Sequence, residues 1–198
     1  MGALEQLAPG LRRWTAWHEE WNEEVASLAV ATGDGLVLID PIAPPAALGA
    51  AAHVLLTVYW HGRSAAAAHA PRIWASRRSA RPLRSRHVGV TDAFSAGDEL
   101  PGGIRAFQTP RASEVAFWLP EQRALVIGDV LLGAGAKPGA TAEPLRLCPE
   151  RWLGTRTHAD LRAMLSPLLE LPVERVLVSH GEPVRSGGAK ALAAIAAS

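Results

Sequence analysis

Apolar residues recur along this chain in short runs that predict β-strands in both halves. Residues 11–17 alternate between apolar and polar side chains, which is typical of a strand with one exposed face. Residues 53–57 and 173–179 are nearly continuous apolar runs, which are typical of strands buried on both faces. Further strands are predicted at residues 25–32, 36–39, 72–75, 103–108, 115–119 and 124–127.

Turn and helix signals separate these strands. Gly33-Asp34-Gly35 and Pro120-Glu121-Gln122-Arg123 each predict a hairpin. Residues 157–171 have the period of an amphipathic helix, and shorter helices are predicted at residues 46–52, 64–70 (with Ser64 as the N-cap) and 186–197. Residues 76–90 predict an exposed connection and residues 132–149 a long loop, because neither has a clear period.

The order of the predicted elements favours an α+β fold. Two strand-rich halves, each closed by helices, predict two sheets packed face to face with helices outside, a four-layer αββα sandwich. No stretch has the composition of a linker, so we expect a single domain over residues 1–198.

Composition narrows the class of protein. With 48% hydrophobic residues and a net charge of +1, the chain of 198 residues predicts a globular domain without general attraction to polyanions. Cys148 is the single cysteine, which excludes an intramolecular disulfide and a thiolate zinc cluster. We see no signal-peptide pattern and no run of about 20 apolar residues, so we expect a cytoplasmic protein without a membrane partner.

Three apolar strands lead directly into polar residues. Asp129 follows the strand at 124–127, His180 follows the strand at 173–179, and the strand at 53–57 runs into a polar turn. Sites of open α/β layers form at the carboxyl ends of strands. An Asp and a His together indicate metal binding or acid–base chemistry, so these two are the candidate catalytic residues.

Four segments of the chain resemble the metallo-β-lactamase superfamily, αββα hydrolases that usually bind one or two metal ions. The matching segments are residues 35–41, 54–57, 115–131 and 176–183, and the resemblance spans roughly residues 11–185. The most specific part is residues 115–131. Asp129 matches the metal-bridging Asp of that family, His180 matches its last His ligand, and Asp40 matches an Asp near the site that is usually not a ligand.

The family's Thr-His-x-His-x-Asp-His motif is altered in this chain. Its four ligand positions fall on Val58, Trp60, Gly62 and Arg63, and a further family His falls at about Pro110. None of these side chains binds zinc.

The resemblance therefore implies a metallo-β-lactamase-like protein that lacks most metal ligands. Our first hypothesis is a non-catalytic or ligand-binding protein, a pseudoenzyme with no cofactor, because zinc sites need at least three protein donors. Arg63 would then point toward Asp129 and replace the metal cation.

The second hypothesis is a hydrolase with a reduced site, in which Asp129, His180 and His61 hold one zinc ion and its activated water. The simpler interpretation of His61 is an exposed loop residue. Tyr59 and Trp60 would fill the former metal cavity or line a pocket for a small molecule.

Two further groups of residues have simple structural interpretations. Arg111 and Glu114 predict a surface ion pair, with a substrate contact as the alternative. Trp14, Trp17 and Trp21, whose spacing fits a helix as well as a strand, predict a core edge or a homodimer contact.

The third hypothesis is nucleic-acid binding through the Arg-rich segment 72–86. Such a site needs interleaved aromatic residues or a groove, and only Trp74 lies nearby. All but two of the chain's basic residues are Arg, so we expect a solvated surface here. The arginines concerned are Arg72, Arg77, Arg78, Arg81, Arg84 and Arg86.

Overall fold

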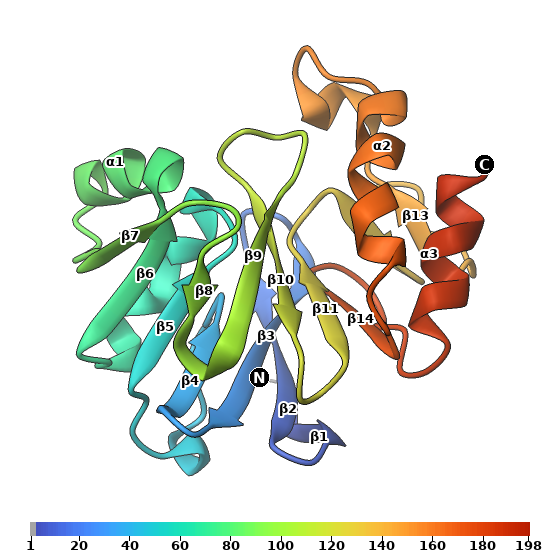
Figure 1. The fold of residues 1–198 in the computed structure, drawn as a ribbon. Helices are drawn as coiled ribbons and strands as arrows, with labels where there is room; N and C mark the ends of the chain where they lie inside the picture. Colours follow the sequence, from blue (N-terminus) through green and yellow to red (C-terminus); the bar gives the residue numbers. More distant parts are fainter. Residues whose placement is uncertain (1–2) are drawn as a thin grey trace.

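The computed structural model describes residues 3–198 and contains two β-sheets packed face to face, with helices on their outer faces (Figure 1). The first sheet has seven strands in the order β1-β2-β3-β4-β5-β6-β7, and the second has five in the order β14-β11-β10-β9-β8. This arrangement confirms the predicted αββα sandwich.

The strands of the first sheet are β1 (Glu5–Ala8), β2 (Leu11–His18), β3 (Glu23–Thr32), β4 (Gly35–Ile39), β5 (His53–Leu56), β6 (Arg72–Ser76) and β7 (Asp92–Phe94). Those of the second are β8 (Glu99–Leu100), β9 (Ile104–Gln108), β10 (Val115–Leu119), β11 (Ala124–Ile127) and β14 (Arg175–Val178). As predicted, β3–β4 and β10–β11 are antiparallel neighbours. The pair β11–β14 is parallel.

Alternating side chains divide each central strand between two cores. Leu55 faces the second sheet, where it joins Phe117 and Val126, whereas Val54 and Leu56 face the outer layer. This explains the continuous apolar run at residues 53–57, because a strand covered on both faces has no solvent side.

Helices supply the two outer layers. The helices α2 (His158–Leu169) and α3 (Gly188–Ala196) cover the second sheet, while α1 (Arg77–Ser85) and the 3₁₀ helices η1 (Ala46–Leu48) and η2 (Tyr59–Ala68) cover the first. Thr157 caps α2 in a capping box with Asp160, so this helix starts where its sequence pattern predicts. Within residues 3–198, no helix is both long and apolar enough to cross a bilayer.

The prediction of an exposed connection at residues 76–90 is wrong, because residues 77–85 form the helix α1. Ser76 caps this helix by accepting a hydrogen bond from the Ser79 amide, and the helix buries Ala80 and Leu83 against the first sheet. Its many arginines hide the helical period. Four of them face solvent, namely Arg77, Arg78, Arg81 and Arg84.

Two other predictions need correction. The predicted loop at 132–149 includes a short antiparallel pair, β12 (Leu131–Gly133) and β13 (Leu145–Leu147). The helix predicted to start at Ser64 begins at Tyr59 and has no side-chain cap. This earlier start matters for the site, because it brings residues 59–63 into an ordered turn directly after β5.

The packing of the two sheets is tested by Phe117→Ala. Phe117 is completely buried between the sheets, with its ring centroid 5.9 Å from that of Phe94. Removing the ring leaves a cavity, so we expect a loss of about 3–5 kcal/mol in the free energy of unfolding in urea. Trp17→Ala, on a side chain that is 47% exposed, should cost far less. Equal effects of the two substitutions would contradict this packing.

Candidate metal centre

Asp129 and His180 lie at neighbouring strand ends of the second sheet. Asp129 follows β11 and His180 follows β14, and because these strands are parallel their carboxyl ends meet at one edge. Nε2 of His180 is 3.5 Å from Oδ1 of Asp129. The two candidate catalytic residues therefore converge at this edge.

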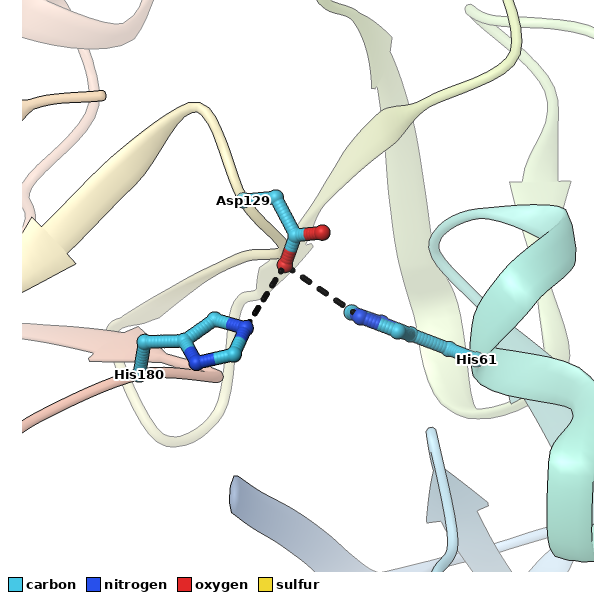
Figure 2. Close-up of side chains that lie close together, drawn as sticks. All are labelled: His61, Asp129 and His180. Atoms are coloured by element: carbon cyan, nitrogen blue, oxygen red, sulfur yellow. Dashed lines mark ion pairs between the residues drawn. The ribbon is translucent and has the colours of Figure 1, made fainter. Parts of the chain in front are cut away.

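His61 completes a cluster of three with them. It is fully buried, and its Nε2 lies 3.2 Å from the same Oδ1 of Asp129, so both rings approach one carboxylate oxygen (Figure 2). The interpretation of His61 as an exposed loop residue is therefore wrong. The physical reason is the early start of η2, whose first turn directs this side chain inward.

A second carboxylate fixes each imidazole ring. Nδ1 of His61 is 2.9 Å from Oδ2 of Asp40, and Nδ1 of His180 is 3.2 Å from Oε2 of Glu23. An ionised carboxylate only accepts hydrogen bonds, so each Nδ1 is the donor. In the neutral ring, Nε2 then presents its lone pair to the centre of the cluster, the usual arrangement around metal-binding histidines.

Asp40 is held in turn by Thr57. The Thr57 amide donates to Oδ1 of Asp40 at 2.9 Å, and the Thr57 hydroxyl donates to Oδ2. As predicted from the resemblance, Asp40 lies beside the site without joining the cluster of three; its part is to orient His61.

The second oxygen of Asp129 has different partners. Nε1 of Trp60 donates to Oδ2 at 2.7 Å, and Nη1 of Arg111 lies 3.8 Å from it. Oε1 of Glu114 accepts hydrogen bonds from the backbone amides of Asp129 and Val130, at 2.7 and 3.1 Å. These contacts hold both the backbone and the side chain of Asp129 in place.

The predicted surface pair of Arg111 and Glu114 is a buried one. Glu114 is completely buried, and its Oε2 accepts from Nη1 of Arg111 at 2.8 Å. Arg111 also donates through Nε and Nη2 to the carbonyl of Trp152. Sequence reasoning underestimated this pair because nothing in its local pattern indicates burial.

Arg63 does not approach Asp129 as predicted. Among residues 3–198, no carboxylate lies within ion-pair distance of its guanidinium, which instead stacks over the Trp21 ring at 5.1 Å. The guanidinium that lies near Asp129 is instead that of Arg111, whose Nη1 is 3.8 Å from Oδ2 of Asp129.

Electrostatic attraction dominates the ionisation of the cluster. Burial lowers the pKa of His61, but attraction to Asp129 and Asp40 outweighs it and raises that pKa to about 9. Burial also lowers the pKa of His180, and its contacts with Asp129 and Glu23 raise it by more. For Asp129, burial is outweighed by the two histidines, so its pKa lies well below the usual value.

The donor atoms fit a zinc ion. One atom from each of His61, Asp129 and His180 lies within 4.8 Å of the others. Ligands about 2.0–2.1 Å from a tetrahedral zinc ion lie roughly 3.3 Å apart, and two separations here are 3.2 and 3.5 Å. Nε2 of His61 and Oδ1 of Asp129 are buried and, within residues 3–198, form no hydrogen bond besides the 3.2 and 3.5 Å contacts of the cluster itself. Two imidazoles and a carboxylate are a known catalytic zinc set.

A cavity of about 750 Å³ adjoins the cluster. Tyr59 and Trp60 line this cavity, and Asp129 and His180 form part of its wall. The other lining residues are Trp21, Glu23, Arg111, Ser113, Lys137, Pro138 and Trp152. Aromatic walls with a few polar groups are typical of small-molecule sites.

Sequence reasoning missed Glu23 and Trp152 as site residues. Glu23 reaches His180 across 157 positions of sequence, and no local motif marks it. His61, by contrast, had a usable signal: Asp40 and Thr57 end neighbouring strands, and a buried Asp at that place needs a partner.

No protein-family model and no curated protein matches this chain. Solved structures do match. A metallo-β-lactamase from Pontibacter korlensis is 18% identical, with 98% of this chain and 99% of that chain covered and a TM-score of 0.67. The metallo-β-lactamase FIM-1 from Pseudomonas aeruginosa, in its mono-zinc form, is 13% identical, with 98% and 94% covered and a TM-score of 0.68.

A metallo-β-lactamase from Hirschia baltica is 14% identical, with 98% of this chain and 97% of that chain covered and a TM-score of 0.65. At such low identity the likeness concerns architecture, and it extends over nearly the whole length of each protein. Together with the two facing sheets and their outer helices, it shows that this chain has the metallo-β-lactamase fold.

Proposed function

We propose that this protein is a metal-dependent hydrolase that uses one zinc ion, held by His61, Asp129 and His180. The observation that carries the proposal is the convergence of three donor atoms from buried residues, Nε2 of His61, Oδ1 of Asp129 and Nε2 of His180, within 4.8 Å of one another. The carboxylates of Asp40 and Glu23 behind the two rings support it. This is the second of the three hypotheses drawn from the sequence.

The site meets the chemical requirements for hydrolysis. His61, Asp129 and His180 would hold a zinc ion, which when bound would lower the pKa of a water molecule to about 7 and so would activate it for attack near neutral pH. Asp129 and His180 form part of the cavity wall, so the cluster lies next to the space available to a substrate, whereas His61 is buried behind them. Arg111 lines the same cavity and has N–H groups beyond those bound to Glu114 and Trp152, which would stabilise negative charge on a carbonyl oxygen.

The cavity wall indicates the class of substrate. Trp21, Tyr59, Trp60 and Trp152 make most of it apolar, and aromatic rings of this kind bind apolar groups and exclude water. We therefore propose an ester or amide with a sizeable apolar part.

Zinc content after purification without chelators tests the proposal. We expect about one zinc per chain in the wild type and a strong loss in His61→Asn and His180→Asn, because each removes one of three donors. His87→Asn is the matched control, since His87 is exposed and outside the cluster. Hydrolysis of aryl esters should follow zinc content across the four proteins. A wild type that takes up no added zinc would favour the metal-free, ligand-binding hypothesis instead.

Zinc affinity should also depend on pH in a specific way. Zinc binds the neutral imidazole, so the proton that His61 holds up to about pH 9 competes with the metal. We expect affinity to rise at least about tenfold per pH unit between pH 7 and 9 and then to level off.

The measurement is a zinc titration against a competing chelator across this range. If zinc affinity stopped rising near pH 6.5, the ordinary pKa of His, that result would contradict the ion pairs assigned to His61.

A further inference from the structure

The side chain of Trp60 contacts the cluster directly. Its indole Nε1–H donates to Oδ2 of Asp129 at 2.7 Å. Trp60 precedes His61 in the first turn of η2. One short segment thus supplies both a candidate metal ligand and a hydrogen bond to another.

The two carboxylate oxygens of Asp129 have different contacts. Oδ1 faces the Nε2 atoms of His61 and His180, whereas Oδ2 is bound by Trp60 and lies 3.8 Å from Nη1 of Arg111. A carboxylate that bridges two cations through separate oxygens, or binds one cation through both oxygens, needs both oxygens available. Here the indole N–H occupies the second one.

Arg111 supports this arrangement from the cavity side. Its guanidinium carbon lies 5.0 Å from the centroid of the Trp60 ring, a cation–π contact, and three of its N–H groups donate to Glu114 and to the Trp152 carbonyl. The ring is therefore packed on one face by a cation that is itself fixed. A second metal ion at Oδ2 would meet both the indole and this positive charge.

We infer that Trp60 is a positioning residue that keeps Asp129 a one-oxygen ligand and, with Arg111, takes the place that a second cation would need. The inference rests on the proposed single-zinc function and adds to it the residue that sets the number of ions and the mode of binding.

The test compares Trp60→Phe, which keeps a ring but removes the N–H donor, with the same substitution at Trp17. Trp17 is 47% exposed and belongs neither to the cluster nor to the cavity wall. Loss of a hydrogen bond that orients a metal ligand weakens metal affinity about 10- to 100-fold. We expect zinc affinity to fall by that factor in Trp60→Phe and to stay at the wild-type value in Trp17→Phe.

Cobalt substitution gives a readout that a general loss of stability would not move. With Oδ2 freed in Trp60→Phe, we expect Asp129 to bind Co²⁺ through both oxygens, so the strong visible bands of four-coordinate cobalt should weaken toward those of five-coordinate cobalt. Unchanged zinc affinity and an unchanged cobalt spectrum in Trp60→Phe would overturn the inference while leaving the single-zinc function intact.

The hydrogen bond itself is testable without metal. In the ¹H–¹⁵N spectrum of the metal-free protein, the indole signal that is missing in Trp60→Phe should lie downfield and shift in Asp129→Asn. If the wild type binds no zinc but this signal behaves as expected, the zinc proposal fails and the positioning of Asp129 stands. If the indole signal keeps its chemical shift in Asp129→Asn, the positioning role of Trp60 is overturned.

Discussion

The buried carboxylate of Asp129 is the constraint around which this end of the molecule is built. An ionised carboxylate in a protein interior is strongly unfavourable unless charges and donors surround it. Here one oxygen faces two imidazoles and the other accepts from an indole, while the backbone amide is tied to Glu114. Each partner is anchored further out, by Asp40, Glu23 or Arg111, so the network extends through two layers of side chains.

The fold supplies these partners from distant parts of the chain. The parallel register of β11 and β14 brings Asp129 beside His180, and β4 with β5 delivers Asp40 and Thr57 behind His61. Glu23 comes from the start of β3 and Arg111 from the loop before β10. These residues come from both sheets, and only the packing of one sheet on the other brings them together. The core between the sheets is therefore linked to the chemistry of the site.

Much of the fold was predictable from the sequence, because strands buried on one or both faces leave a direct apolar pattern and short turns join them. Helix α1 was missed because arginines dominate its composition. The site was predictable in part: Asp129 and His180 end recognisable strands, so their convergence follows from topology. The role of His61 could not be predicted, because it depends on the residue at which η2 begins. No side-chain capping residue marks that start in the sequence. Glu23 and the burial of Glu114 depend on long-range packing alone.

The most direct measurement is X-ray diffraction at the zinc absorption edge from crystals grown with equimolar zinc. A zinc ion held as described gives one anomalous peak per chain, about 2.0–2.2 Å from Nε2 of His61, Oδ1 of Asp129 and Nε2 of His180. In that structure Oδ2 of Asp129 would still accept from Trp60. No peak at these three atoms, or a peak bound through Oδ2, would contradict the assignment of this cluster as a single-metal site.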